Sequence, residues 1–344
     1  MRVGLVYDPI YLKHDTGQHP ENAKRLEAII SYLEQTGIKE QLIPIRPRTA
    51  STQELSLVHD EQYISMIQNV AQNGGGSLDP DTVMSSDSYE ATLYAAGGVI
   101  TATEAVMKKE VDSIFALVRP PGHHATHQRA MGFCLFNNIA IATEYALRNY
   151  SLQRILIIDF DVHHGNGTQE AFYNNPNVLY ISTHEYPFYP GTGSIEETGN
   201  GPAKGTTINI PLPAGSGDTE YLKVFQEIII PATKRFKPQL IMVSAGYDNH
   251  WADELALMQV STTGFTQMAE IIKNLADELC NGRMVFSLEG GYNLTALATS
   301  VKATFDVLMN KTTIEDPLGQ PTRRNKPPSI DSLTQNIRKI HKLF

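Results

Sequence analysis

The stretch "ILIIDFDVHHGNG" (residues 155–167) joins an apolar run to two aspartates and two adjacent histidines. The run at 155–158 has the composition of a buried strand. Carboxylates that directly follow such a strand are costly to bury unless a positive charge lies between them. Side chains two apart on an extended chain point the same way, so Asp161 and His163 offer an oxygen and a nitrogen to one point. The stretch therefore predicts a buried strand whose polar end binds a metal ion.

Comparable apolar runs recur along the chain, at 2–8, 113–119, 154–160, 178–183, 240–246 and 283–290, with a further candidate at 206–212. Helical patterns lie between them, at 87–109, 134–149, 219–236 and 262–281. Strands that are apolar on both faces and alternate with helices are typical of a mostly parallel sheet covered by helices. The pattern predicts an α/β fold with a mostly parallel central sheet.

Composition narrows the class of protein. The 344 residues carry 28 Lys+Arg against 37 Asp+Glu, a formal charge of -9, which argues against nucleic-acid binding. Two distant cysteines, Cys134 and Cys280, make a disulfide framework or a thiolate zinc site unexpected. We find no apolar run of about 20 residues and no leader-like segment before the run at 2–8. We therefore expect no membrane contact and a cytoplasmic protein.

Polar residues follow five of the expected strands. In an open parallel sheet the carboxyl ends of the strands meet at one edge, where ligands bind. The segments at these ends are "RPPGHHA" (119–125), "DFDVHHGNG" (159–167), "THEYPFYPGTG" (183–193), "YDNH" (247–250) and "EGGYN" (289–293). The sequence predicts that their side chains gather in a single site.

Asp161, His163 and Asp248 are the candidate metal ligands. Catalytic zinc commonly takes three His, Asp or Glu ligands and keeps one position open. In the alternative interpretation, Asp161 caps a helix and His163 packs against it. A second histidine pair and an aspartate at another strand end favour the metal. The ligand set does not separate Zn²⁺ from Fe²⁺.

His123 and His124 are adjacent, so their side chains diverge and cannot share a metal ion. An imidazole near neutral pKa suits proton transfer, and each ring needs a partner that orients it. Asp159 and Asn166 are the candidates. Tyr292 follows two glycines, and a tyrosine hydroxyl beside a metal can donate to a developing oxyanion. Taken alone, the histidine pair is equally compatible with hydrogen bonding in a loop, and a tyrosine after two glycines is more often a packing residue.

Together these residues resemble the histone deacetylase family, zinc-dependent enzymes with an arginase-like α/β/α fold of three layers. The shared motifs are "HPENAKRL" (19–26), "RPPGHHA" (119–125), "GFCLFNN" (132–138), "DFDVHHGNGTQ" (159–169), "FYPGTG" (188–193), "SAGYD" (244–248) and "EGGYN" (289–293). The resemblance spans residues 1–310 and implies a catalytic domain there. It leaves 311–344 as an extension, in which Leu333, Ile337, Ile340 and Leu343 predict a terminal helix docked on the domain.

The resemblance implies a role for each candidate. Asp161, His163 and Asp248 match the zinc ligands. His124 matches the general base that activates water and protonates the leaving amine, His123 its electrostatic partner, and Asp159 the carboxylate behind His123. Tyr292 matches the tyrosine that polarises the acetyl carbonyl. Asn166 stands where some branches of the family carry Asp. A neutral amide should stabilise the protonated ring of His124 less than a carboxylate does, so the pKa of His124 should be lower in this chain.

The resemblance also implies a tunnel and two cation sites. Phe133 and Tyr189 match aromatic tunnel walls, although many members carry Phe at the position of Tyr189, and Gly132 would lie beside the scissile amide. One structural K⁺ site matches Asp159, Asp161, His163, Ser182 and Thr183. A more distant K⁺ site matches Phe172, Asn175 and Val178.

Three other functions were weighed. A dimanganese ureohydrolase would need a carboxylate two residues after His163, where Gly165 stands, and a further Asp near Asp248, where Asn249 and His250 follow. The sequence therefore lacks ligands for a second metal ion. A small-amine amidohydrolase acting on acetylpolyamines would carry an acid at Leu255, where this chain is apolar but has Asp253 and Glu254 beside it. Asp79, Asp81 and Asp87 either form an acidic rim or are only solvated.

A non-catalytic acyl-lysine binding protein is disfavoured because both histidines and Tyr292 are intact. The sequence predicts deacetylation of N-acetylated lysine, in protein or peptide, with a small acetylated amine as the alternative. The formation of homo-oligomers is left open.

Overall fold

The computed structural model describes residues 2–313, 315–321 and 329–343. In this part of the chain, an eight-stranded sheet has the order β2-β1-β5-β10-β9-β6-β7-β8, and each neighbouring pair is parallel. The strands are β1 (Val3–Val6), β2 (Ile43–Ile45), β5 (Ser113–Ala116), β6 (Ile155–Asp159), β7 (Val178–Glu185), β8 (Thr207–Leu212), β9 (Leu240–Ala245) and β10 (Met284–Leu288). All seven expected strands are present. The half-buried edge strand β2 was not predicted, since it has three residues and contains a proline.

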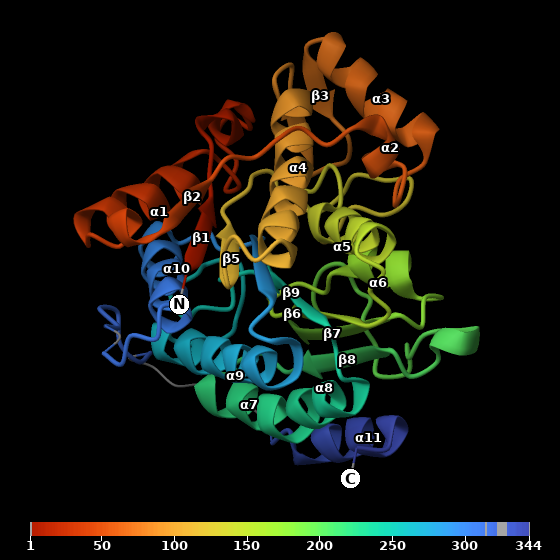
Figure 1. Cartoon of the computed structure of the whole chain (residues 1–344), viewed down its shortest axis with the longest axis vertical. Helices are drawn as coiled ribbons and strands as arrows, with labels where there is room; N and C mark the ends of the chain where they lie inside the picture. The colour runs from red at the N-terminus through yellow and green to blue at the C-terminus, as the bar shows by residue number, and fades with distance from the viewer. Residues whose placement is uncertain (1, 314, 322–328, 344) are drawn as a thin grey trace.

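Helices cover both faces of the sheet, which confirms the predicted three layers (Figure 1). On one face, α4 (Ser88–Met107) packs on β5 and β10, α5 (Asn138–Asn149) on β9, and α6 (Asn166–Phe172) on β7. On the other face, α9 (Thr262–Cys280) packs on β9 and on α10 (Leu294–Leu308), which contacts α1 (Lys24–Gln35). The central strands β6, β9 and β10 are therefore buried along their whole length, as their apolar composition requires.

The predicted helix at 219–236 is interrupted. It consists of α7 (Asp218–Val224), a π-helical turn (Phe225–Ile229) and α8 (Ile230–Phe236). Pro231 has no backbone N–H to continue the α-helical pattern, and the wider turn precedes it. The helix expected from 134 begins at Asn138, because the Asn137 side chain accepts a hydrogen bond from the amide of Ala140 and caps it.

Smaller elements complete the chain. They are α2 (Thr52–Leu55), α3 (Glu61–Gln72), the antiparallel hairpin of β3 (Gly75–Ser77) and β4 (Val83–Ser85), α11 (Asp331–His341), and the 3₁₀ helices Pro9–Lys13, Lys39–Gln41 and Gly201–Ala203. The terminal helix α11 lies against the π-helical turn and β8, with Ile337 buried (Figure 1). The extension at 311–344 falls partly outside the described residues, at 314, 322–328 and 344.

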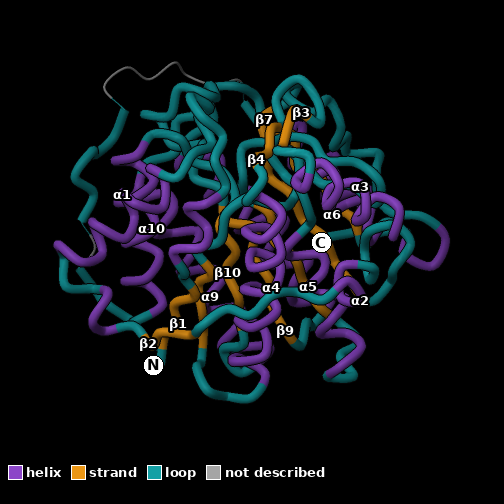
Figure 2. Tube along the Cα trace, turned by 90° about the horizontal axis from the view of Figure 1, so that it is seen from above, coloured by secondary structure: helices purple, strands orange, loops and turns teal. Residues whose placement is uncertain are grey.

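The sheet presents one edge to a set of long loops. In Figure 2 these loops lie at the top, on the side of the sheet opposite the N-terminus and the start of β1. Because the strands are parallel, the loops that follow β5, β6, β7, β9 and β10 all start at this edge. None of the helices in the described part combines the length and the apolar content that a bilayer span requires.

Candidate metal centre and active site

Asp161, His163 and Asp248 come together beyond the ends of β6 and β9. One ligand atom from each lies within 4.8 Å of the others. Nδ1 of His163 is 3.2 Å from Oδ1 of Asp161 and 3.2 Å from Oδ2 of Asp248. The two aspartates are fully buried and His163 is mostly buried. The backbone fixes both carboxylates, since Oδ1 of Asp248 accepts from the amide of Val162 and Oδ2 of Asp161 from that of Gly290.

The cluster fits a divalent cation. Among the described residues, Oδ2 of Asp248 is a buried oxygen that accepts no hydrogen bond of good geometry. Burial and the nearby Asp161 carboxylate raise the pKa of Asp248 to about 6. Two buried carboxylates with an imidazole form a donor set of the kind that binds zinc or iron. A cation between them would offset the cost of burying both charges.

Two glycines pack against these carboxylates. A Cβ added to Gly290 would lie 2.1 Å from Oδ2 of Asp248, and one added to Gly246 would lie 2.0 Å from Oδ2 of Asp161. A third glycine, Gly165, has the same role behind the histidines, because a Cβ there would lie 2.1 Å from Oδ2 of Asp159. The chain therefore has no room at Gly165 for the extra carboxylate that a dimanganese site would need.

His123 and His124 lie in the loop after β5, and each contacts the partner expected from the sequence. Nδ1 of His123 is 3.1 Å from Oδ2 of Asp159, and Nδ1 of His124 is 2.8 Å from Oδ1 of Asn166. Burial lowers the pKa of His123, but the carboxylates of Asp161 and Asp159 outweigh it and raise the pKa to about 10. Burial, together with His123 and His163, holds the pKa of His124 well below its usual value. The two rings therefore differ in charge.

The histidine loop is also held by Glu289, which sequence analysis missed. Its fully buried carboxylate accepts from the amides of Gly122 and His123, at 2.7 and 3.2 Å, and from the Ser244 hydroxyl. Burial raises the pKa of Glu289 to about 7. The signal was present in "EGGYN", because an acid that directly follows an apolar strand must be satisfied internally.

Tyr292 follows β10 and borders the same site. The guanidinium carbon of Arg25 lies 4.9 Å from the centre of its ring. Burial and the carboxylates of Asp248 and Asp161 raise the pKa of Tyr292 well above its usual value, although Arg25 opposes this. The hydroxyl is therefore protonated at neutral pH and can donate a hydrogen bond. Arg25 was not among the predicted residues, although it lies in the "HPENAKRL" motif.

A narrow cavity of about 180 Å³ leads to the cluster. Its lining consists of Asp81, Pro121, His123, His124, Gly132, Phe133, His163, Phe188, Tyr189, Leu255, Gly290 and Tyr292. The predicted walls Phe133 and Tyr189 thus face one cavity with both histidines. Phe188, which was not predicted, stacks on His163 with ring centres 5.4 Å apart. Gly132 abuts His124, since an added Cβ would lie 2.3 Å from its Cδ2.

The acids near the cavity differ in position. Leu255 lines the cavity, whereas the Asp253 carboxylate is buried and accepts hydrogen bonds from backbone amides of the neighbouring loops. Glu254 is exposed to solvent. Of the three candidate rim acids, Asp81 lines the cavity and Asp79 accepts a hydrogen bond from its amide. Exposed Asp87 precedes α4 and is not part of the lining, so only part of the proposed rim faces the cavity.

The predicted K⁺ ligands lie in two places. Asp159 pairs with Ser182 in the register of β6 and β7, next to Asp161 and Thr183. In the turn before β7, the carbonyl of Phe172 accepts from Asn175 and that of Asn175 accepts from Val178. The structure therefore groups each set, and both K⁺ sites stay predictions.

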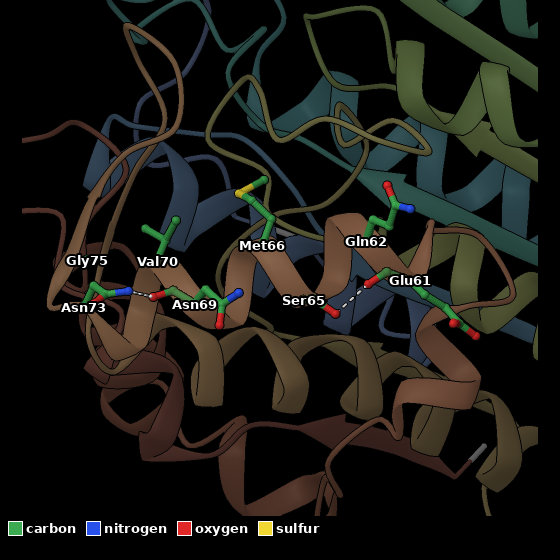
Figure 3. A pocket seen from close by; sticks show the side chains of 8 residues that line it. All are labelled: Glu61, Gln62, Ser65, Met66, Asn69, Val70, Asn73 and Gly75. Carbon is green, nitrogen blue, oxygen red and sulfur yellow. Dashed lines mark hydrogen bonds between the residues drawn. The ribbon is translucent and has the colours of Figure 1, made fainter.

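A larger hollow, of about 670 Å³, lies elsewhere along α3 and is open to solvent (Figure 3). It is lined by Glu61, Gln62, Ser65, Met66, Asn69, Val70, Asn73 and Gly75. This groove contains none of the predicted site residues. Its size therefore does not make it the better candidate, and the chemistry points to the narrow cavity.

Comparison with known proteins agrees with this geometry. The histone deacetylase domain matches residues 19–308. The chain is 40% identical over 349 residues to "Histone deacetylase 14, chloroplastic" of Arabidopsis thaliana, with 96% of this chain and 82% of that protein covered. It is 43% identical over 297 residues to a "Probable deacetylase" of Archaeoglobus fulgidus, with 86% and 82% covered.

Among solved structures, the HDA15 HD domain superposes with a TM-score of 0.90 at 34% identity, covering 100% of this chain and 95% of that one. The fold is thus the arginase-like deacetylase fold that the sequence predicted. These matches identify a hydrolase that acts on acetylated amides, and the chain belongs to the histone deacetylase family.

Proposed function

We propose that this protein removes the acetyl group from N-acetylated lysine side chains at a zinc-containing site. The observation that carries the proposal is the composition of one cavity. His123, His124 and Tyr292 line one space of about 180 Å³, and His163, which also lines it, joins this space to the buried carboxylates of Asp161 and Asp248. Proton transfer, oxyanion stabilisation and metal binding can therefore act on one amide group.

The metal would be held by Asp161, His163 and Asp248. A divalent ion in such a position supplies a Lewis acid that polarises a carbonyl and lowers the pKa of water. The three protein ligands leave room for substrate, as in catalytic rather than structural zinc sites. Iron(II) binds the same kinds of donor atom, so the ligands alone do not select the metal. We propose zinc because the family resemblance implies it, with Fe²⁺ as the alternative.

His124 would move the proton. Oδ1 of Asn166 can only accept, and the Asn166 amide nitrogen lies 3.4 Å from the carbonyl of His124, so Nδ1 of His124 carries a hydrogen. Nε2 is then free to act as a base. It takes a proton from the attacking water, whose oxygen adds to the acetyl carbon, and returns the proton to the amine as the C–N bond breaks.

His123 would act through charge. It carries a proton at neutral pH, since its pKa is raised to about 10 by Asp161 and Asp159 against the effect of burial. The cation next to His124, with ring centres 4.0 Å apart, keeps the His124 imidazole neutral and ready to accept. Asp159 holds the His123 ring through Nδ1 and stabilises this charge.

Tyr292 would stabilise the oxyanion. Its hydroxyl stays protonated, and Tyr292 lines the same cavity as His123 and His124, so it can donate to an oxyanion that forms there. Loss of a single oxyanion donor typically lowers kcat by about 10² to 10³. This sets the size of the effect expected on its removal.

The walls favour an alkyl chain. Phe133, Phe188 and Tyr189 form aromatic surfaces beside the histidines, which suits the methylene chain of acetyl-lysine. Leu255 adds an apolar contact where a polyamine-type enzyme would carry an acid. The buried acid beside it in the chain, Asp253, accepts hydrogen bonds from three backbone amides. These contacts favour acetyl-lysine over a small acetylated polyamine, which stays the second candidate.

The test is Tyr292→Phe with an acetyl-lysine peptide, with zinc content measured in parallel. We expect kcat to fall about 10²- to 10³-fold with zinc binding retained. His163→Ala should instead lose zinc. Tyr186→Phe makes the same chemical change on an exposed side chain and should leave kcat unchanged. Full turnover by Tyr292→Phe would contradict the proposed mechanism.

A further inference from the structure

Two glycines precede Tyr292 in its loop. Gly290 and Gly291 precede the tyrosine, and Gly291 has a φ of +114°, a conformation that other residues rarely adopt. With two glycines in sequence, the backbone of the loop has many other conformations open to it. The position of the Tyr292 hydroxyl therefore depends on contacts that hold the loop from outside.

One side of the loop is held by its carbonyl groups. Nε of Arg25 donates to the carbonyl of Gly291 at 2.6 Å, and an Nη of the same guanidinium donates to the carbonyl of Glu289 at 2.5 Å. Arg25 is fully buried, so these bonds are shielded from water. The Gly291 carbonyl belongs to the same planar peptide group as the Tyr292 amide, so Arg25 holds one side of that group and leaves its N–H to another partner.

The other side is held by Asp253. Oδ2 of this carboxylate accepts from the amide of Tyr292 at 2.6 Å and from that of Asn293 at 2.9 Å. Asp253 is only 6% exposed. Asn293 returns a bond to the carbonyl of Ala252 at 2.8 Å and caps the first turn of α10. The carboxylate thus lies at a helix N-terminus, where a negative charge is favourable.

The second oxygen of Asp253 reaches a different part of the site. Oδ1 accepts from the amide of Leu255 at 3.1 Å, and Leu255 lines the cavity. A single buried carboxylate therefore links the cavity wall to the tyrosine loop. A movement of either one is opposed by the bonds to the other.

We propose that Asp253 is a positioning residue for the reaction, which fixes Tyr292 relative to the wall at Leu255. The inference rests on the proposed role of Tyr292. Charge-assisted hydrogen bonds to backbone amides are short and directional, so they suit a residue whose function is placement. A misplacement of about 1 Å in such a constellation can cost about 10²-fold in rate.

Asp253→Asn tests this with little change of shape. The side-chain amide of the variant has one acceptor oxygen in place of two. Either the backbone amides of Tyr292 and Asn293 or the backbone amide of Leu255 therefore loses its acceptor. We expect kcat for an acetyl-lysine peptide to fall roughly 10- to 100-fold and KM to change less than about threefold. Glu254→Gln removes a charge from the exposed neighbour and should change neither constant.

The double variant separates positioning from general damage. With Tyr292→Phe already present, Asp253→Asn should lower kcat by less than about twofold further, because the group it positions is gone. Zinc content and Tm are recorded for each variant. Equal losses in the two backgrounds, or a loss explained by zinc content or unfolding, would overturn the positioning role. Full turnover by Tyr292→Phe alone would instead overturn the proposed function.

Discussion

Asn166→Asp is the most informative change at the histidine pair. Oδ1 of Asn166 lies 2.8 Å from Nδ1 of His124, and a carboxylate there would face the imidazole directly. His124 acts as a base when it is neutral. A nearby negative charge favours the protonated ring and therefore raises the pKa of His124. The variant should lose activity at low pH first.

The size of the effect follows from the geometry. Two unit charges about 4 Å apart interact by about 4 kcal/mol at an effective dielectric constant of about 20. Asn166 is partly exposed, so solvent screening reduces this value. An opposite charge at such a distance typically moves a titration by about 1 to 3 pH units. We expect the acidic limb of kcat/KM to move upward by about 1 to 2 pH units.

The assay is kcat/KM for an acetyl-lysine peptide between pH 5 and 9, with zinc content determined at each end. Asn69→Asp is the matched control, because it introduces the same charge on α3 in the groove of Figure 3. Its profile should match that of the unmodified protein. An unmoved acidic limb in Asn166→Asp would refute the assignment of His124 as the base.

Three further changes probe other parts of the site and the fold. Gly290→Ala places a Cβ 2.1 Å from Oδ2 of Asp248, so zinc affinity measured by chelator competition should fall at least about tenfold. Leu255→Asp should raise kcat/KM for an N-acetylated polyamine relative to a peptide by about tenfold, which about 1.4 kcal/mol of attraction would produce. His59→Gln should flatten the pH dependence of the free energy of unfolding. Burial lowers the pKa of His59 to about 4, so the unmodified fold binds fewer protons than the unfolded chain between pH 4 and 6.5, and it loses about 2 kcal/mol between pH 6.5 and 5.

Each of these has a result that would count against it. Zinc affinity unchanged in Gly290→Ala would mean that the carboxylates do not hold the metal as the cluster implies. If the ratio of kcat/KM for the polyamine and the peptide is unchanged in Leu255→Asp, the side chain at 255 does not determine substrate preference. Parallel stability curves for His59→Gln and the unmodified protein, from chemical denaturation at each pH, would show that His59 does not titrate as its burial requires.

Much of this architecture could be predicted from the apolar pattern of the strands and from the position of polar residues at the strand ends. The run at 155–158 is apolar on both faces because β6 is a central strand of a sheet that helices cover on both sides, and parallel strands bring their polar ends to one edge. The need to orient each ring made Asp159 and Asn166 candidate partners, and the family resemblance assigned Asp159 to His123 and Asn166 to His124. Both contacts are present. Residue types at strand ends thus indicated the neighbours.

Other features could not be predicted from local pattern. The π-helical turn before Pro231 depends on how one helix accommodates a missing amide, which periodicity does not specify. The contacts of Arg25 with the loop at 289–291 join residues more than 260 positions apart. In the sequence, Asp253 is only one of two acids beside Leu255. Its role as an acceptor for three amides depends on the fold of two separate loops.

The central claim is that the cavity is built for acetyl-lysine. The most direct measurement is a comparison of kcat/KM for an acetyl-lysine peptide and an N-acetylated polyamine, with the same zinc-loaded protein and buffer. The apolar wall at Leu255 and the occupied carboxylate of Asp253 predict a preference for the peptide of at least about tenfold. A preference for the polyamine by a similar factor would contradict the account and assign the protein to the hydrolysis of small acetylated amines.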